Sequence, residues 1–300
     1  MTSAGSAGDA LLDADLPAEA LLPYPAAQVV RRLRDKRALP GLFAEGGFRT
    51  AATLAEGTPG ELLEASLPYP RVLKPAGKGG AKGTAEVMRS EAELRSALRA
   101  LPPGEPLLVQ EKLSGPLGSL ALVVARDGRL VARFQHSVRR TSRLGTTVVA
   151  RSVAPDEALA DRAARVLGDS GYFGLAQLDY FDTPRGPAVI DINPRFYGSM
   201  PLAGAARVNL PVAWQSVVTN GAAGSPTDYR LGVTYRWLEG DVVAAIQGAA
   251  DVLTHRCAPP KVGDMWARDD PMTSIVYGSQ ILAKRVWRRV PRQVRRRLKR

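Results

Sequence analysis

The chain has 300 residues, with 41 basic side chains (Lys and Arg) against 29 acidic ones and a formal net charge of +12. Ten of the basic residues lie in 284–300, so the rest of the chain is nearly neutral, with 31 basic residues against 29 acidic ones. A single cysteine excludes an internal disulfide framework, and two histidines exclude a histidine zinc cluster. The length is compatible with one large or two modest domains.

The N-terminal segment predicts no export signal. Residues 1–20 are acidic and lack the basic region that opens a signal peptide. No apolar run approaches the roughly 20 residues that span a bilayer. We therefore expect a soluble cytoplasmic protein.

The hydrophobic pattern and the turn residues predict a mixed chain. In chain order, the predicted elements are a helix at 26–44 interrupted at Pro40, strands at 70–75 and 84–90, a helix at 90–104, strands at 107–113, 119–128, 129–138 and 146–153, a helix at 155–171, two strands within 173–195, and a helix at 211–221. Asp127-Gly128 is a two-residue hairpin signal, and Ser90 with Glu93 is a capping-box pattern. Helices mixed with antiparallel strands predict the α+β class.

A glycine- and lysine-rich segment follows the first predicted strand. Three of the eight lysines and four glycines lie within 74–84. Glycines allow close backbone approach to an anion and lysines supply positive charge, so the segment is a candidate phosphate-binding loop. It matches neither G-x4-G-K-[ST] nor G-x-G-x-x-G. A flexible basic hairpin is the alternative.

Three oxygen-bearing side chains lie near the end of the last strand pair. Asp191 and Asn193 are two residues apart and so share one face of a strand, and a hairpin would bring Asp179 alongside them. Carboxylate and amide oxygens suit Mg²⁺ better than zinc. The alternative is a set of solvated turn formers, but the neighbouring Val189, Ile190 and Ile192 favour a buried strand, where an unpaired carboxylate is unfavourable.

Two further segments have weaker signals. Residues 109–115 are an apolar strand that ends at Glu111 and then at a glycine, which on its own also fits a strand followed by a turn. Residues 139–147 form a basic loop that either holds an anion or is simply solvated.

The order of these motifs resembles that of the ATP-grasp superfamily, in particular its carbamoyl phosphate synthetase-like and D-alanine–D-alanine ligase-like carboxylate–amine ligases. The resemblance covers roughly residues 35–220. Its motifs are the opening Asp35-Lys36, the strand at 69–75 with the glycine-rich loop after it, the segment at 110–115 and the ending Asp191-Ile192-Asn193-Pro194-Arg195. It implies an ATP-grasp fold, in which two α+β lobes with antiparallel sheets grip a nucleotide, followed here by a basic C-terminal extension.

The resemblance also implies roles for individual residues. Lys36 and Lys74 would contact ATP phosphates, and Arg195 would reach phosphate or substrate, so that Lys74 and Arg195 are the candidate catalytic residues. Residues 79–83, with Gly79, Gly80 and Gly83, would cover the phosphates. Gln110, Glu111, Lys112 and Leu113 would hold adenine, with Glu111 facing the exocyclic amine. Mg²⁺, or Mn²⁺ in its place, would be bound by Asp179, Asp191 and Asn193, with Gln177 as the rival to Asp179.

The sequence departs from the family pattern in three places. The middle metal ligand is usually Glu, where this chain has Asp191. Members commonly carry an acid for the ribose where this chain has 116–118, Pro-Leu-Gly. Only 34 residues precede Asp35, where relatives have a whole α/β domain. We therefore expect 1–34 to be a remnant of that domain or a flexible N-terminus, or the chain to depend on a partner that supplies the domain.

The predicted domain organisation follows from the motifs. Residues 35–106 would form the small lobe, 107–220 the large lobe, 221–270 a C-terminal packing segment and 271–300 a basic tail. The tail places apolar residues four apart among its arginines, so 284–300 is a candidate for contact with an anionic membrane. A solvated end is the alternative, and no specific nucleic-acid partner is expected.

The resemblance implies an ATP- and Mg²⁺-dependent ligase that activates a small-molecule carboxylate as an acyl phosphate for attack by an amine, most often forming a carbon–nitrogen bond. Two alternatives belong to other classes. One is a catalytically incomplete ATP-binding module or subunit, and the other is a binder of anionic membranes or nucleic acids through the tail.

Overall fold

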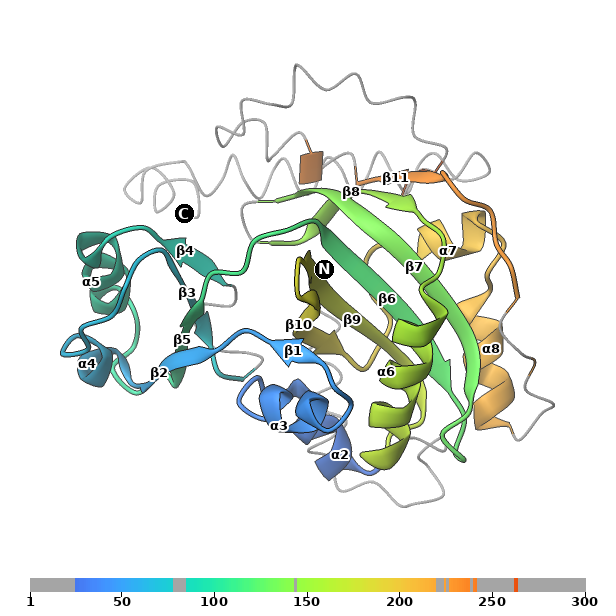
Figure 1. The fold of residues 1–300 in the computed structure, drawn as a ribbon, viewed down its shortest axis with the longest axis horizontal. Helices are drawn as coiled ribbons and strands as arrows, with labels where there is room; N and C mark the ends of the chain where they lie inside the picture. Colours follow the sequence, from blue (N-terminus) through green and yellow to red (C-terminus); the bar gives the residue numbers. More distant parts are fainter. Residues whose placement is uncertain are drawn as a thin grey trace, which may run out of the picture.

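The computed structural model of the chain describes residues 25–77, 85–142, 145–219, 224, 227–237, 240–241 and 262–263. These residues form two mainly antiparallel sheets that lie beside one another, the smaller at the left of Figure 1 and the larger at the right. No helix in the described ranges has the length and apolar character that crossing a membrane requires. The α+β class and the paired sheets predicted from the sequence are confirmed.

The smaller sheet has two helices on one face. Its strands, in spatial order, are β2 (Thr53–Gly57), β5 (Leu107–Glu111), β3 (Arg71–Pro75) and β4 (Glu86–Met88). The helices are α4 (Pro59–Leu62) and α5 (Glu91–Arg99). Leu94 and Leu98 of α5 pack on Leu73 and Val109 of the sheet, which leaves the other face of the sheet free to line a site.

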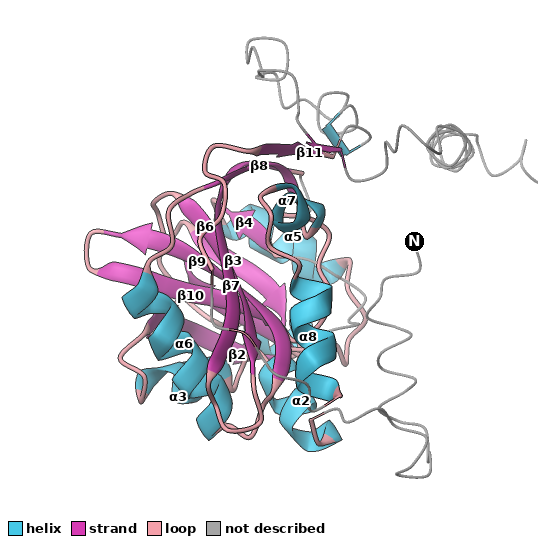
Figure 2. Ribbon diagram, turned by 90° about the vertical axis from the view of Figure 1, so that its right-hand side faces the viewer, coloured by secondary structure: helices cyan, strands magenta, loops and turns pink. Residues whose placement is uncertain are grey.

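The larger sheet is covered by helices on both faces (Figure 2). Its strands, in spatial order, are β1 (Arg49–Thr50), β10 (Gly186–Asn193), β9 (Gly174–Thr183), β6 (Leu117–Val124), β7 (Leu130–Thr141), β8 (Thr147–Ser152), β11 (Thr234–Arg236) and β12 (Val262–Gly263). One face packs on α2 (Ala27–Arg34), α3 (Leu39–Ala44) and α6 (Glu157–Asp169), and the other on α7 (Pro201–Ala205) and α8 (Leu210–Val218).

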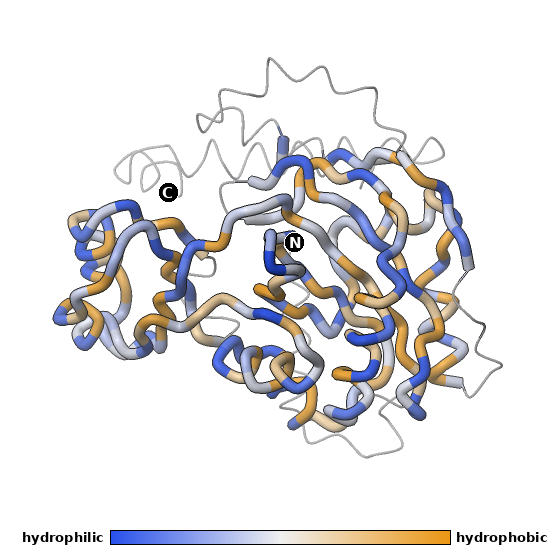
Figure 3. The backbone as a smooth tube through the Cα atoms, in the orientation of Figure 1, coloured by the Kyte–Doolittle hydropathy of each residue, from blue (hydrophilic) through white to orange (hydrophobic). Residues whose placement is uncertain are grey.

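The alternation of side chains along the central strands explains the two layers. On β6, Leu120 and Leu122 belong to the α6 side, whereas Ala121 and Val123 belong to the α7–α8 side. Figure 3 shows hydrophobic stretches along strands of the larger sheet. Both faces of these strands are therefore buried over most of their length.

Local signals fix the helix boundaries. Pro40 stands in the first turn of α3, so the helix predicted at 26–44 is two helices separated at 35–38. The hydroxyl of Ser90 accepts a hydrogen bond from the backbone N–H of Glu93 at 3.2 Å and so caps α5 as predicted. Asp156 caps α6 in the same way, through the N–H of Leu159 at 2.9 Å.

The chain passes between the two sheets twice within the core, at 51–52 and at 112–116. Strand β5 therefore belongs to the smaller sheet, and the passage comes five residues after the lobe boundary predicted at 106/107, because Leu107–Glu111 pairs with β2 and β3. Gly115 lies in the second passage with φ +143°, where a Cβ would come within 2.0 Å of the carbonyl oxygen of Asp182. This close approach requires glycine.

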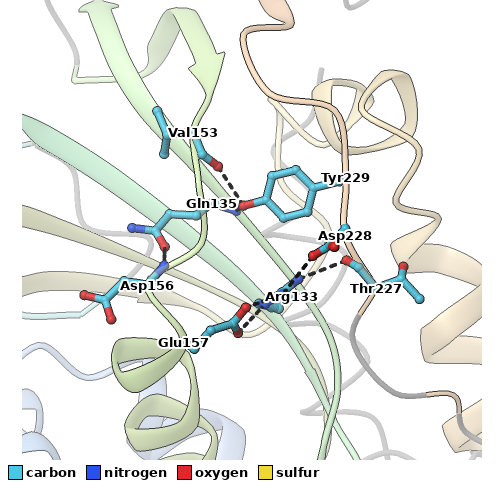
Figure 4. A network of polar contacts seen from close by, with 8 residues as sticks. All are labelled: Arg133, Gln135, Val153, Asp156, Glu157, Thr227, Asp228 and Tyr229. Carbon is cyan, nitrogen blue, oxygen red and sulfur yellow. Dashed lines mark hydrogen bonds and ion pairs between the residues drawn. The ribbon is translucent and has the colours of Figure 1, made fainter.

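A polar network fastens the segment at 227–230 to the larger sheet (Figure 4). Arg133 on β7 is buried and pairs with Glu157 at the start of α6 and with the carbonyl of Thr227. The hydroxyl of Tyr229 donates to the carbonyl of Val153 at 2.9 Å. One arginine thus joins a strand, a helix N-terminus and a segment far away in the sequence.

Candidate functional site

A cleft of about 500 Å³ lies where the two sheets face each other. Its walls come from the free face of the smaller sheet, the 112–115 passage and the end of the β9–β10 hairpin. The side chains that line it include Lys36, Ala51, Val72, Lys74, Val87, Gln110, Glu111, Lys112, Leu113, Asp179, Phe181, Ile190 and Asp191. Most of the residues predicted from the sequence within the described ranges therefore meet in one place.

Lys74 joins the two sheets at the centre of this cleft. It lies on β3, is 5% exposed, and donates a hydrogen bond from Nζ to the carbonyl of Ile190 at 3.2 Å. Burial lowers the pKa of Lys74 to about 8; the negative charge of Asp191 opposes this shift and the positive charge of Lys36 adds to it. A desolvated ammonium of this kind binds an entering anion strongly, because little water competes for it.

Lys36 also lines the cleft, next to Asp191. It follows α2, and its backbone N–H donates to the carbonyl of Ala76 at the end of the smaller sheet, at 3.0 Å. Its Nζ lies 3.9 Å from Oδ1 of Asp191. Asp35, its partner in the predicted opening motif, is instead bound to Arg37, whose guanidinium lowers the pKa of the Asp35 carboxyl. Lys36 is therefore the member of the pair that faces the cleft.

The pairing of β9 with β10 places the predicted oxygen ligands side by side. Asp179 is the cross-strand partner of Asp191, and Gln177 is the partner of Asn193, so all four side chains share one face of the hairpin. A register shift between Val189 and Asp191 lets the consecutive residues Ile190 and Asp191 both border the cleft.

Asp179 and Gln177 differ in what their side chains do. Asp179 borders the cleft, whereas Gln177 is buried and its amide nitrogen donates to the hydroxyl of Ser119 at 2.6 Å and lies 3.4 Å from Oδ1 of Asp179. Of the two rivals, the one that faces the cleft is Asp179.

The donor set fits Mg²⁺. Asp179, Asp191 and Asn193 offer carboxylate and amide oxygens, and magnesium is typically held by one or two carboxylates together with substrate phosphates and water. Among the described residues no group of three His, Cys, Asp or Glu side chains forms a metal cluster, which is the arrangement that a structural zinc site would need. The two lysines would balance the charge of the phosphates around such an ion.

The other end of the cleft is apolar. Val72 and Val87 of the smaller sheet face Phe181 across the cleft, beside the 112–115 passage. Such walls suit a flat heterocycle with its polar edge at the backbone of the passage.

The side chain of Glu111, at the apolar end of the cleft, is held by the backbone of Ala52. Its Oε1 accepts the backbone N–H of Ala52 at 3.0 Å, and its own N–H donates to the carbonyl of Ala52 at 3.0 Å. The side chain expected near an exocyclic amine therefore joins the end of β5 to the passage at 51–52. Lys112 and Leu113 lie beyond the end of β5 and provide the backbone at the rim of the cleft.

Arg195 lies just beyond the cleft, in the segment after β10. Its Nη2 is 3.4 Å from Oδ1 of Asn193, and its Nη1 donates to the carbonyl of Phe196 at 2.9 Å. The guanidinium is thus next to the third proposed ligand rather than among the residues that line the cleft.

Several expectations fall on residues outside the described ranges. These are the loop glycines Gly79, Gly80 and Gly83, most of 221–270 and the tail at 284–300. The basic loop predicted at 139–147 is shorter in the structure, because β7 continues to Thr141 and β8 begins at Thr147. Arg140 therefore lies on β7, where it pairs with the buried Asp241 at 2.7 Å, and Arg236 pairs with the same carboxylate.

A polar row that was not predicted from the sequence lies on the larger sheet next to the cleft. His136 is the cross-strand partner of Ser119, which in turn is the partner of Asp179. Tyr197 lies over this row, with its ring 6.4 Å from that of His136 and nearly parallel to it. The alternation of polar residues at 177 and 179 was visible in the sequence, but the pairing that aligns them with 119 and 136 was not.

Comparisons with known proteins find one family match and several solved structures with a similar fold. Residues 104–241 match the model of a family described as ATP-grasp in the biosynthetic pathway with Ter operon. No curated protein sequence matches the chain. The family match and the solved structures described below confirm the resemblance to the ATP-grasp superfamily.

Three solved structures show the same fold at low identity. The biotin carboxylase domain of 2-oxoglutarate carboxylase from Hydrogenobacter thermophilus, solved with MgADP and bicarbonate, is 18% identical over 70% of this chain and 51% of its own, with a TM-score of 0.55. N5-carboxyaminoimidazole ribonucleotide synthetase from Thermus thermophilus is 21% identical over 69% and 57%, with a TM-score of 0.56. L-amino acid ligase from Bacillus licheniformis is 17% identical over 71% and 52%, with a TM-score of 0.51. The chain thus spans about half the length of these structures.

Proposed function

We propose, from the match of residues 104–241 to an ATP-grasp family and from the fold shared with ATP-grasp structures, that the protein is an ATP- and Mg²⁺-dependent ligase that joins a small-molecule carboxylate to an amine. The observation that carries the proposal is the meeting of Lys74 and Lys36 with Asp179 and Asp191 in the cleft between the two sheets. Two cations and two carboxylates at one end of an apolar cleft suit a magnesium nucleotide. The names of the structural relatives, which include carboxylases and an amino acid ligase, support the same reaction class.

The proposed reaction has two steps, formation of an acyl phosphate and its displacement by the amine. A carboxylate oxygen attacks the γ-phosphorus of ATP, the bond to the β–γ bridging oxygen breaks, and ADP leaves. The amine nitrogen then attacks the acyl carbon, the C–O bond to phosphate breaks, inorganic phosphate leaves with both electrons, and the nitrogen loses a proton. This chemistry depends mainly on positioning and on charge stabilisation rather than on a protein nucleophile.

The lysines supply the charge stabilisation. Lys74 is held by the carbonyl of Ile190 with its ammonium in a dry part of the cleft, so it needs no rearrangement when phosphate oxygens arrive. Lys36 stands beside Asp191 and would exchange that contact for a phosphate oxygen. Arg195, next to Asn193, would neutralise the phosphate that is transferred or the carboxylate that receives it.

Asp179, Asp191 and Asn193 are the residues that would hold Mg²⁺, with Mn²⁺ as the substitute ion. When bound, the ion neutralises phosphate charge and orients the γ-phosphate. Asp191 is one methylene shorter than the glutamate usual in this superfamily, and it directly follows the register shift of β10, where Ile190 and Asp191 both border the cleft.

The test is acceptor-dependent ADP release by the full chain, with a panel of amino acids and other carboxylates paired with amines. Carboxylates labelled with ¹⁸O add a direct signature, because an acyl phosphate intermediate passes one labelled oxygen to inorganic phosphate. We expect activity in the wild type and its loss in Lys74→Ala and Asn193→Ala. ADP formation that transfers no label would contradict acyl phosphate chemistry, and binding of ATP without any acceptor-dependent turnover would favour an ATP-binding module or subunit.

A further inference from the structure

Tyr197 carries a buried hydroxyl that is left without an acceptor. The residue is 7% exposed, and its O–H has no hydrogen-bond partner within the described part of the chain. A buried polar group is normally paired, so an isolated one indicates a partner that arrives with a ligand or a conformational change. The residue follows the Asn193-Pro194-Arg195 segment, whose asparagine we propose as a metal ligand.

The backbone on both sides of Tyr197 is fixed. The N–H of Arg195 donates to the carbonyl of Asn193 at 2.8 Å, and the hydroxyl of Tyr235 donates to the carbonyl of Gly198 at 3.2 Å. One residue further on, the hydroxyl of Ser199 lies 3.4 Å from Nε2 of His136. The ring of Tyr197 is also nearly parallel to that of His136, with the two centroids 6.4 Å apart.

Along the strand order from His136, the first proposed metal ligand on this face is Asp179. His136 and Asp179 stand on either side of Ser119 on adjacent strands, two strand spacings or roughly 10 Å apart. The ring of Tyr197 covers the His136 end of this row. Burial, with the charge of Asp179 as the next cause, raises the pKa of Tyr197, so the phenol stays protonated and remains a donor.

We propose that Tyr197 is a positioning residue whose hydroxyl donates a hydrogen bond to the carboxylate of Asp179 when a metal–nucleotide complex occupies the cleft. A metal-bound carboxylate uses one oxygen for the ion, and a donor on the other oxygen fixes its orientation. The amide of Gln177 already lies 3.4 Å from Asp179, but it makes a much shorter bond to Ser119. The inference rests on the proposed function, because it assigns Asp179 to the metal.

The test compares Tyr197→Phe with Tyr172→Phe, which removes a buried hydroxyl that already donates to the carbonyl of Leu175. The readouts are thermal unfolding of the free protein and Mn²⁺ affinity in the presence of ADP, measured from the EPR signal of free Mn²⁺. We expect Tyr197→Phe to unfold at or above the wild-type temperature and to bind Mn²⁺ about tenfold more weakly. Tyr172→Phe should unfold at a lower temperature and bind Mn²⁺ as the wild type does.

A double-mutant cycle with Asp179→Asn identifies the partner, because Tyr197→Phe should then have no further effect on Mn²⁺ affinity. If Tyr197→Phe does not fold, near-ultraviolet difference spectra decide, recorded at MgADP concentrations that saturate each protein: a tyrosine shift in the wild type that is lost in Asp179→Asn supports the bond, and its absence from the wild type overturns it. Unchanged Mn²⁺ affinity in a folded Tyr197→Phe overturns this inference alone. A wild type that binds no Mn²⁺ with ADP overturns the proposed function as well.

Discussion

Lys74 on the smaller sheet donates a hydrogen bond of 3.2 Å to the backbone carbonyl of Ile190 on the larger one. Since Ile190 stands at the register shift that also exposes Asp191, one contact joins the two sheets, the predicted phosphate-binding lysine and the proposed metal site. The relationship leads to opposite expectations for stability and for binding.

Replacing Lys74 with methionine should stabilise the free protein and abolish nucleotide binding. The buried ammonium is desolvated, so its removal should raise the free energy of unfolding by roughly 1–2 kcal/mol even though the bond to Ile190 is lost. The same change removes the cation that we propose for the phosphates. Urea unfolding and calorimetry with MgATP measure the two effects. A Lys74→Met protein that is less stable and binds ATP normally would contradict both.

The affinity for MgATP should fall as the pH rises through about 8. Burial lowers the pKa of Lys74 to about 8, so the side chain loses its charge within an accessible range. The sign for stability is the reverse: above about 8 the unfolded chain binds more protons than the folded one, and stability linked to this group rises with pH up to its ordinary pKa. Calorimetric titrations from pH 6.5 to 9 check the first statement. A Lys74→Arg variant, which stays charged, should flatten the profile if it folds and binds.

Acid should destabilise the protein through His136. Complete burial lowers the pKa of this imidazole to about 4, whereas in the unfolded chain it is near 6.5. The unfolded state therefore binds the extra proton first, and stability present above pH 6.5 is lost as the pH falls toward 4, by about 3 kcal/mol in total. Urea unfolding at intervals between pH 7 and 4.5 measures the slope. A His136→Gln variant should lose this component, and an unchanged slope would show that other groups cause it.

Arg133 should matter more for stability than its partner Glu157. The arginine is 5% exposed and also bonds to the carbonyl of Thr227, so Arg133→Met should lower the free energy of unfolding by roughly 2–3 kcal/mol. More than half of the Glu157 side chain is exposed, and Glu157→Gln should cost under about 1 kcal/mol. Equal effects of the two changes would mean that the ion pair, not the anchoring of residue 227, provides the stability.

Much of the fold could be predicted because its signals are local. The cap of α5 by Ser90, the hairpin turn at Asp127-Gly128 and the strand pair ending at Asp191 depend on residues close together in the sequence. Lys36, Lys74 and Asp191 could be predicted as cleft residues because the order of their motifs resembles that of a known family, even though the sequence contains no information on the distances between them.

The rest depends on long-range pairing. Nothing local indicates that β5 pairs with β2 and β3, which moves 107–111 into the smaller sheet. The bond between Glu111 and Ala52 and the row from His136 to Asp179 likewise arise from strand registers between distant segments. Side-chain roles within a predicted motif thus needed the structure, even where the motif itself did not.

The most direct test of the central claim is equilibrium binding of ATP to the full chain by calorimetry, with and without Mg²⁺. We predict one nucleotide per chain, bound much more tightly when Mg²⁺ is present, and a binding signal that is lost in both Lys74→Met and Asp191→Asn. A wild-type chain that binds no MgATP, or a chain whose binding survives both substitutions, would show that the cleft between the sheets is not a nucleotide site.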